Sequence, residues 1–283
     1  MDKEKYIHRI IDNKISEYLQ TFGAICIEGP KWCGKTWTSS YHSNSSIFLG
    51  DPAGNFQNRK LAEMSPDLIL DGDFPRLIDE WQEVPPVWDA VRYKVDQVPQ
   101  KGQYILTGSA TPDHKGIMHS GAGRISKLRM RPMSLYESGD SSGRVSLEEI
   151  CHGKITPVMS GEVDLRELIR LIVRGGWPGS LELPVNQAAL LPMEYLNAVI
   201  DDDVYRMDGI KRNTIKMKLL LRSLARNEST TVTNKTLKND IKEVDDEDID
   251  VETVKEYLDI FARLFITDDQ PPFATKVRSS VRV

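Results

Sequence analysis

The stretch "GPKWCGKT", residues 29–36, has the Gly-x-x-x-x-Gly-Lys-Thr spacing of a phosphate-binding loop. Glycines at both ends let the backbone turn so that successive N–H groups face phosphate oxygens. Lys35 would bring a positive charge to the β and γ phosphates, and the Thr36 hydroxyl would reach Mg²⁺. The spacing therefore predicts that a nucleoside triphosphate and Mg²⁺ bind through the whole loop, made of Gly29, Pro30, Lys31, Trp32, Cys33, Gly34, Lys35 and Thr36.

Two adjacent carboxylates follow a second apolar stretch, "RLIDE", residues 76–80. Asp79 is expected to bind Mg²⁺, directly or through its water. Glu80 would then orient and deprotonate the attacking water. A buried carboxylate pair without such a role would be costly, because unpaired charge resists burial. The pair indicates a hydrolase, since phosphoryl transfer by P-loop kinases needs no water-activating base at that position.

The elements around these residues alternate in type. The apolar run 24–28, "AICIE", precedes the loop, and "KTWTSSYH" behind it can begin a helix, which favours a nucleotide site over a glycine turn that binds nothing. Further strands are expected at 46–51, 76–80, 104–109 and 124–130, with helices between them. This alternation predicts an α/β fold, a P-loop NTPase parallel sheet with flanking helices. Ligands bind such sheets at the carboxyl ends of the strands.

Three parts are expected along the chain. Residues 1–135 would form the ATPase core, and residues 136–210 a linker and a mostly helical lid. Residues 211–283 would form a winged-helix-like domain, because amphipathic helices are followed by a candidate hairpin at 264–278. A long helix is expected at 186–207, with an interruption at Pro192.

Charge decides which partner the winged-helix-like part is expected to meet. The chain of 283 residues has a net charge of −5, so it has no overall basic field for nucleic acid. The helix in the position of a recognition helix carries three acidic and two basic side chains: Glu252, Glu256, Asp259, Lys255 and Arg263. DNA affinity depends mainly on Lys and Arg contacts to phosphates. We therefore expect a protein partner and leave DNA as the less favoured alternative.

Composition also bears on the compartment. No apolar run approaches the roughly 20 residues of a membrane helix, and the first ten residues are charged where a signal peptide would be apolar. Three scattered cysteines fit a reducing environment. A cytoplasmic protein with no membrane partner is expected. Cys33 is expected to be an accessible thiol of lowered pKa that ATP protects, because Lys35 and a helix N-terminus lie near it, whereas Cys26 should be buried and inert.

Several segments together resemble a known family. "GPKWCGKT", "RLIDEWQEVPPVWDAVRYKVD", "YILTGSAT", "GAGRISKLRMRPMSLYES" and "RGGWPGSL" are similar to the archaeal and bacterial AAA+ type ATPases whose core is followed by a domain of unknown function. The resemblance runs from about Tyr6 to the C-terminus. Members of that family continue from a winged-helix segment into a strand-rich, nuclease-like region, which is expected to begin where this sequence stops.

The resemblance also implies roles for individual residues. Asp79 and Glu80 match the Walker B pair, and either Thr107 or Ser109 matches the sensor that positions the attacking water. Arg124 falls where related ATPases carry an arginine finger, often supplied by a neighbouring subunit, so a homo-oligomer is one expectation and a plain surface arginine the other.

The segment "GGWP" resembles an element that packs on the adenine ring in related ATPases. That resemblance would place Pro178 in the nucleotide site, while a simple turn between helices remains the alternative.

Three functions remain open from the sequence. The first is an ATPase that couples Mg²⁺-dependent hydrolysis to a conformational change. The second is a nucleotide-gated binding or scaffolding module that hydrolyses slowly. The third is a DNA-associated ATPase, which depends on family analogy and the expected winged helix alone.

Overall fold

A computed structural model describes residues 3–109, 117–154, 157–159 and 161–269. The chain divides into two compact units, Met1–Arg212 and Asn213–Val283. The first unit contains the phosphate-loop sequence.

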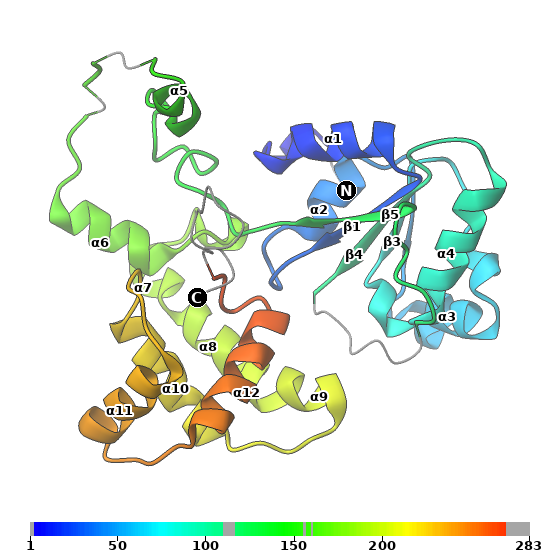
Figure 1. The fold of residues 1–283 in the computed structure, drawn as a ribbon. Helices are drawn as coiled ribbons and strands as arrows, with labels where there is room; N and C mark the ends of the chain where they lie inside the picture. Colours follow the sequence, from blue (N-terminus) through cyan, green and yellow to red (C-terminus); the bar gives the residue numbers. More distant parts are fainter. Residues whose placement is uncertain (1–2, 110–116, 155–156, 160, 270–283) are drawn as a thin grey trace. The chain divides into compact units, whose positions relative to one another are not determined.

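A five-stranded parallel sheet forms the centre of the first unit (Figure 1), as the alternation of elements predicts. Its spatial order is β2-β3-β4-β1-β5, and every neighbouring pair is parallel. The strands are β1 (Ala24–Glu28), β2 (Ser45–Phe48), β3 (Arg76–Asp79), β4 (Tyr104–Gly108) and β5 (Ile125–Arg129). Each expected strand is confirmed, with ends that differ by at most three residues from the expected ranges.

Both faces of this sheet are buried, and the alternation of side chains along β1 shows how. Ala24 and Cys26 belong to a core cluster on one face, together with Val87 and Val91. Ile25 and Ile27 belong to the cluster on the other face. Because successive side chains of a strand point to opposite faces, a strand covered on both sides must be apolar throughout. This explains the uninterrupted run "AICI".

Helices cover the two faces of the sheet. On one face lie helices that contribute Ala62, Val87, Trp88 and Val91 to the core, and on the other α1 contributes Ile15. The elements of this part are η1 (Lys3–Lys5), α1 (Ile11–Thr21), α2 (Lys35–Tyr41), α3 (Ala53–Met64), η2 (Pro66–Ile69), η3 (Trp81–Glu83) and α4 (Pro86–Gln97).

Beyond β5 the first unit is helical. Its elements are α5 (Leu147–Cys151), α6 (Leu165–Arg174), η4 (Pro178–Ser180), α7 (Val185–Ala188), α8 (Leu190–Ala198), the π-helix η5 (Val199–Asp203) and α9 (Val204–Asp208). The expected helix at 186–207 is divided at Ala189, between α7 and α8, three residues before Pro192, which lies in the first turn of α8. The π-helix η5 then continues directly from α8 into α9.

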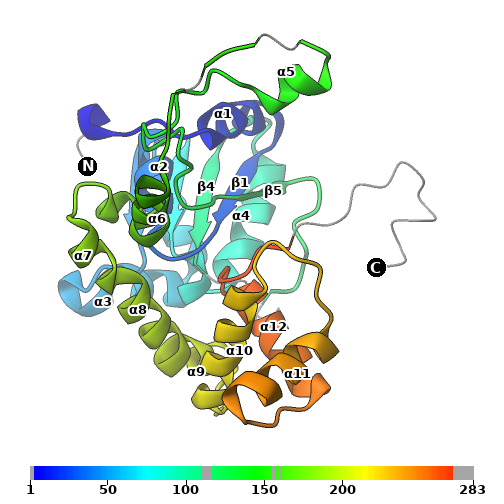
Figure 2. The same ribbon diagram turned by 90° about the vertical axis from the view of Figure 1, so that its left-hand side faces the viewer.

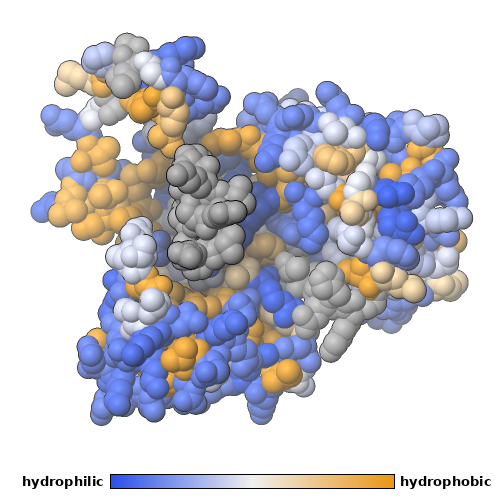
Figure 3. Space-filling view, in the orientation of Figure 1, coloured by the Kyte–Doolittle hydropathy of each residue, from blue (hydrophilic) through white to orange (hydrophobic). Residues whose placement is uncertain are grey.

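Helix α6 leaves much of its apolar side exposed. Leu165, Ile169 and Ile172 are spaced three or four residues apart, so they share one face, and each is at least half exposed. Figure 3 shows apolar side chains gathered over this helix. Its N-terminus is capped by Asp164, whose carboxylate accepts a hydrogen bond from the Glu167 N–H at 2.7 Å.

The second unit contains three packed helices, α10 (Thr214–Arg226), α11 (Asn234–Asp245) and α12 (Val251–Arg263) (Figure 2). They bury apolar side chains that include Leu220, Leu237, Ile241, Val254 and Phe261. The three helices lie within the range 211–283, for which a winged-helix-like domain stays a prediction. Residues 264–269 form no strand, and the rest of the expected hairpin, 270–278, lies outside the described residues.

No helix within the described ranges is both long enough and apolar enough to cross a membrane.

Candidate nucleotide-binding site

The loop between β1 and α2 needs glycine at both ends. A side chain at Gly29 would come within 2.2 Å of the Met130 carbonyl oxygen, which a real Cβ does not approach. Gly34 has a φ of 101°, in the left-handed region that favours glycine, and it immediately precedes the first residue of α2, Lys35. The two glycines therefore fix the turn that the sequence motif predicts.

Lys35 lies inside the turn. Its side chain is buried, and Nζ donates hydrogen bonds to the carbonyl oxygens of Gly29 at 2.9 Å and Pro30 at 2.8 Å. The positive charge is therefore held within the loop, close to the backbone N–H groups that begin α2. Positive charge and a helix N-terminus at one place favour a bound anion.

Asp79 joins the end of β3 to the loop. Its Oδ1 accepts hydrogen bonds from Thr36 Oγ1 at 3.0 Å and from Thr107 Oγ1 at 2.6 Å. Burial raises the pKa of the Asp79 carboxyl, and the charge of Glu80 adds to this rise, while the two hydroxyls and Lys35 oppose it. Asp79 and Thr36 place a carboxylate and a hydroxyl oxygen together, and oxygen is the donor that Mg²⁺ prefers.

Glu80 leaves the strand with a φ of 56°, a left-handed conformation that is uncommon for a residue with a side chain. Its backbone N–H donates to Thr107 Oγ1 at 3.0 Å, and its Oε2 accepts from Ser109 Oγ at 3.1 Å. The Gln82 amide also donates to Oε2 and lies 3.4 Å from Ser109 Oγ. Thr107 therefore fixes both carboxylate residues from inside the sheet, and Ser109 fixes the Glu80 side chain beside it.

These residues surround a pocket of about 460 Å³. Its lining comes from the loop, from α2 and from the ends of β3 and β4: Lys31, Trp32, Gly34, Lys35, Thr36, Trp37, Glu80, Gln82, Glu83 and Ser109. A second pocket of about 190 Å³ also touches Gly34 and Trp37. Pro178 lines this second pocket, together with Tyr6, Arg9 and Met133. Two pockets that share Gly34 give room for a phosphate chain and for a base.

Arg124 lies at the amino-terminal end of the strands, opposite the end that carries the phosphate loop. Its carbonyl oxygen accepts from Ala24 N–H at 3.0 Å, at the start of β1, whereas the phosphate loop follows the end of β1. The two ends of a five-residue strand are about 13 Å apart. The Arg124 side chain is half exposed and pairs with Asp96 at 2.9 Å. The structure therefore does not bring Arg124 together with the loop of its own chain.

The expectation for Cys33 is wrong. The residue is fully buried, and Sγ lies 4.0 Å from the Met130 carbonyl oxygen. Burial raises the pKa of the Cys33 thiol, although the charges of Lys35 and Arg9 act in the other direction. Position in a phosphate loop made the thiol seem reactive, but the loop turns this side chain into the core. Cys26 is buried as expected, and burial raises the pKa of its thiol.

Sequence reasoning missed the contacts that residues 136–210 make with the loop. Lys31 Nζ forms an ion pair with Asp203 at 2.7 Å. The Trp32 ring lies edge-on to Trp177, with centroids 6.3 Å apart, and Trp177 lies 4.9 Å from Tyr195. Burial and the charge of Asp203 raise the pKa of Tyr195 to about 12. A tryptophan in the loop was the one available signal, because it is an unusual residue where backbone groups bind phosphate.

The sheet, the loop at the end of β1 and the carboxylates at the end of β3 define a P-loop nucleotide-binding protein. Residues 21–139 match the AAA domain family, and residues 165–283 match a family described as a domain of unknown function, DUF8612. Along the chain, an AAA domain match is thus followed by a match to this C-terminal domain.

A solved structure supports the same fold. The Walker-type ATPase PABY2304 of Pyrococcus abyssi is 13% identical, with a TM-score of 0.52 over 92% of this chain and 90% of that chain. The structure of C. elegans PCH-2 is 16% identical, and the match covers 88% of this chain and 65% of that chain, but its TM-score of 0.25 is too low to bear on the fold. No curated protein matches the chain.

Proposed function

We propose that this P-loop ATPase hydrolyses ATP with Mg²⁺ at the 460 Å³ pocket and that hydrolysis drives a conformational change. The observation that supports the proposal is the chain of contacts from Thr36 through Asp79 to Thr107, with Glu80 at the pocket wall. It joins a hydroxyl of the phosphate loop, which follows β1, to two carboxylates at the end of β3, and β4 lies between these two strands. This is the arrangement that metal-assisted hydrolysis of a phosphate chain needs.

Each residue would have a separate part in this reaction. The phosphates would be bound by the Lys35 ammonium and by the backbone N–H groups of the loop, except at Pro30, which has none. Thr36 and Asp79 would hold Mg²⁺, which supplies charge neutralisation at the phosphates when bound. Glu80 would take the proton of the attacking water, held in place by Ser109 and Gln82. Ser109 suits the sensor role better than Thr107, because Thr107 is fully buried while Ser109 lines the pocket.

The second pocket would take the adenine ring. Its wall includes Pro178, which lies near Gly34, so a base there would be continuous with the phosphates in the loop. Residues 136–210 would act as a lid, because Asp203, Trp177 and Tyr195 from this segment contact the loop or its tryptophan. Loss of a phosphate from the loop would disturb these contacts, which is how hydrolysis would reach the lid.

Three features support proposals about partners. The exposed apolar face of α6 and the distance of Arg124 from its own loop support a homo-oligomer in which a neighbour completes the site. Glu252, Glu256 and Asp259 are exposed on α12, which supports a protein partner for the second unit over DNA.

The described cysteines are all free, which fits a cytoplasmic location.

Steady-state phosphate release tests the proposal. Wild-type protein should hydrolyse ATP when Mg²⁺ is present and should lose this turnover when a chelator removes the metal. Nucleotide that binds without measurable turnover would support the second candidate, a nucleotide-gated module, for which the lid contacts alone would suffice. Turnover that appears only with added DNA would support the third.

A further inference from the structure

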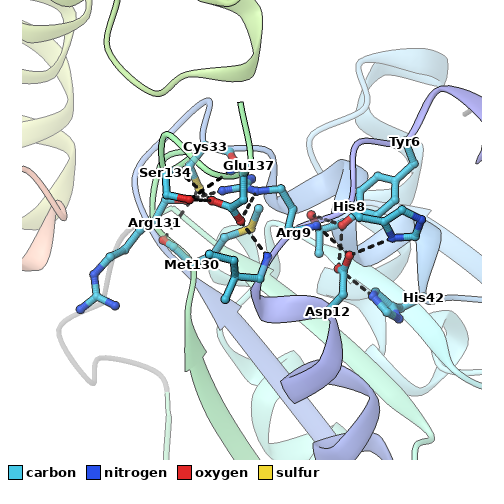
Figure 4. Close-up of polar contacts among 12 residues, drawn as sticks. Tyr6, His8, Arg9, Asp12, Cys33, His42, Met130, Arg131, Ser134 and Glu137 are labelled. Atoms are coloured by element: carbon cyan, nitrogen blue, oxygen red, sulfur yellow. Dashed lines mark hydrogen bonds and ion pairs between the residues drawn. The ribbon is translucent and has the colours of Figure 1, made fainter. Parts of the chain in front are cut away.

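The buried side chain of Arg9 holds together three segments that are far apart in the sequence (Figure 4). Its Nη1 donates to the Cys33 carbonyl oxygen in the phosphate loop at 2.7 Å, and its Nη2 donates to the Arg131 carbonyl oxygen at 2.8 Å. Its Nε donates to Glu137 Oε1 at 2.9 Å. One guanidinium therefore contacts the loop, the segment after β5 and a carboxylate at the same time.

Glu137 is itself firmly placed. Besides Arg9, its Oε1 accepts from the Ile10 N–H at 2.8 Å. Its Oε2 accepts from the Ser134 N–H at 2.8 Å and from the Ser134 hydroxyl at 3.0 Å. Only 5% of the Arg9 side chain and 8% of the Glu137 side chain are exposed, so solvent screens the ion pair little. The guanidinium is thus oriented by a partner that cannot easily move.

The contact with Cys33 matters because of peptide geometry. The Cys33 carbonyl and the Gly34 N–H belong to one planar trans peptide, in which C=O and N–H point in opposite directions. Fixing the carbonyl therefore fixes the N–H. Glycine is the residue with the freest backbone, so the peptide beside Gly34 needs outside support to keep one orientation. Arg9 Nη1 would lie only 3.3 Å from a Cβ placed on Gly34, which shows how closely it borders this peptide.

We propose that Arg9 is a positioning residue for phosphate binding. Its guanidinium holds the Cys33 carbonyl away from the site and so aims the Gly34 N–H at the phosphate oxygens of a nucleoside di- or triphosphate, while Glu137 holds the guanidinium. The inference rests on the proposed nucleotide site. Arg9 has two alternative roles. It could only stabilise the fold, or it could line the 190 Å³ pocket and contact only the base.

Calorimetric titration with Mg²⁺-ADP and with Mg²⁺-pyrophosphate separates these roles, because pyrophosphate has no base. Arg9→Met keeps the apolar stem but removes every donor. It should weaken both ligands by roughly tenfold or more, the usual worth of a buried charged hydrogen bond. Arg9→Lys keeps a charge beside Glu137, but an ammonium group cannot reach two carbonyls as the rigid guanidinium does. Compared with Arg9→Met, it should therefore recover more of the wild-type melting temperature than of the affinity for the two ligands.

Arg76→Met is the matched control. Arg76 also donates to a backbone carbonyl, that of Ile69 at 2.8 Å, and to the Ser45 hydroxyl at 3.1 Å. It lies at the start of β3, at the amino-terminal end of the strands, whereas the loop lies at their carboxyl end. Its loss should lower the melting temperature and leave both affinities unchanged. All titrations are made well below the lowest melting temperature of the set.

The outcomes are distinct. The inference is supported if Arg9→Lys binds both ligands more weakly while Arg76→Met binds both with wild-type affinity. This holds even if Arg9→Met does not fold. Wild-type affinity for both ligands in Arg9→Lys and Arg9→Met, with only the melting temperature lowered, overturns it in favour of a structural brace. Weakened ADP with unchanged pyrophosphate overturns it in favour of a base-pocket wall. If the wild-type protein binds neither ligand, the proposed function fails first.

Discussion

The Cys33 thiol is enclosed by protein although its backbone forms part of the phosphate loop. Because burial raises its pKa, little thiolate is present at neutral pH, and a reagent has no path to the sulfur. We predict slow alkylation of Cys33 by iodoacetamide at pH 7.5, with no protection by ATP. Mass spectrometry of the labelled peptides measures the rate at each cysteine.

Cys151 is the internal control for this labelling. It is exposed at the end of α5 and should react quickly in the same sample. Rapid labelling of Cys33 that ATP prevents would show that the loop opens in solution and would restore the accessible thiol that the sequence suggests.

Residues of the site differ in how well the sequence predicts them. Lys35, Thr36 and Asp79 follow from local patterns, because a loop motif and a strand end each fix their place within a few residues. Arg9 and Glu137 are 128 positions apart and meet only in the folded unit. No short-range pattern marks such a pair, so a contact between distant segments could not be predicted from one sequence.

At the scale of elements, the segment before α1 is tied to α2 through Asp12. The Asp12 carboxylate accepts from the Tyr6 hydroxyl at 2.7 Å, from the Arg9 N–H at 2.8 Å and from His42 at 3.0 Å, with His8 at 3.3 Å. Burial acts to raise the pKa of Asp12, but these hydrogen bonds outweigh it and lower the pKa below its ordinary value. The same holds for Glu137, through Ser134, Ile10 and Arg9.

A folded-state pKa that is lowered stabilises the protein at pH values above the unfolded-state pKa, and this stabilisation is lost as the pH falls through the folded-state pKa. We therefore predict that the melting temperature is level near neutral pH and falls once the pH drops below about 4.5, where unfolded carboxyls begin to bind protons. Asp12→Asn should be less stable near neutral pH and should lose less on acidification. Equal losses in Asp12→Asn and the wild type would contradict this origin.

Elements were predictable to different degrees. The inner strands β1 and β4 follow from apolar runs because both of their faces are covered, whereas the edge strands β2 and β5 are more polar and partly exposed. The helices between 185 and 208 follow less well, since the single helix expected there is divided at Ala189 and contains a π-helix. The sequence alone does not distinguish an α-helical from a π-helical turn here. The contacts of Asp203 and Tyr195 with Lys31 and Trp32 of the loop are made between distant segments.

At the scale of the whole molecule, the place of Arg124 separates two kinds of protein. This side chain cannot reach its own loop, so it acts on a neighbour or it has no part in turnover. If it acts on a neighbour, Arg124→Ala should bind ATP normally and hydrolyse it much more slowly, by roughly 10³-fold or more. Specific activity of the wild type should rise with protein concentration, since assembly follows mass action.

Mixing two inactive variants tests this directly. Lys35→Ala loses its own nucleotide site but keeps Arg124, and Arg124→Ala keeps the site. Together they should recover part of the activity. Flat activity with concentration and no recovery on mixing would indicate a surface arginine paired with Asp96, as the exposed ion pair at 2.9 Å also allows.

The central claim is that Glu80 activates the water that attacks ATP bound in the phosphate loop. Its most direct test is ATP affinity and turnover of Glu80→Gln, measured on the same preparation with Mg²⁺ present. Glutamine keeps the shape and the contact with Ser109 but cannot accept the proton. We predict ATP affinity within a few-fold of the wild type and turnover reduced by about 10²-fold or more. Turnover at the wild-type rate would contradict the account.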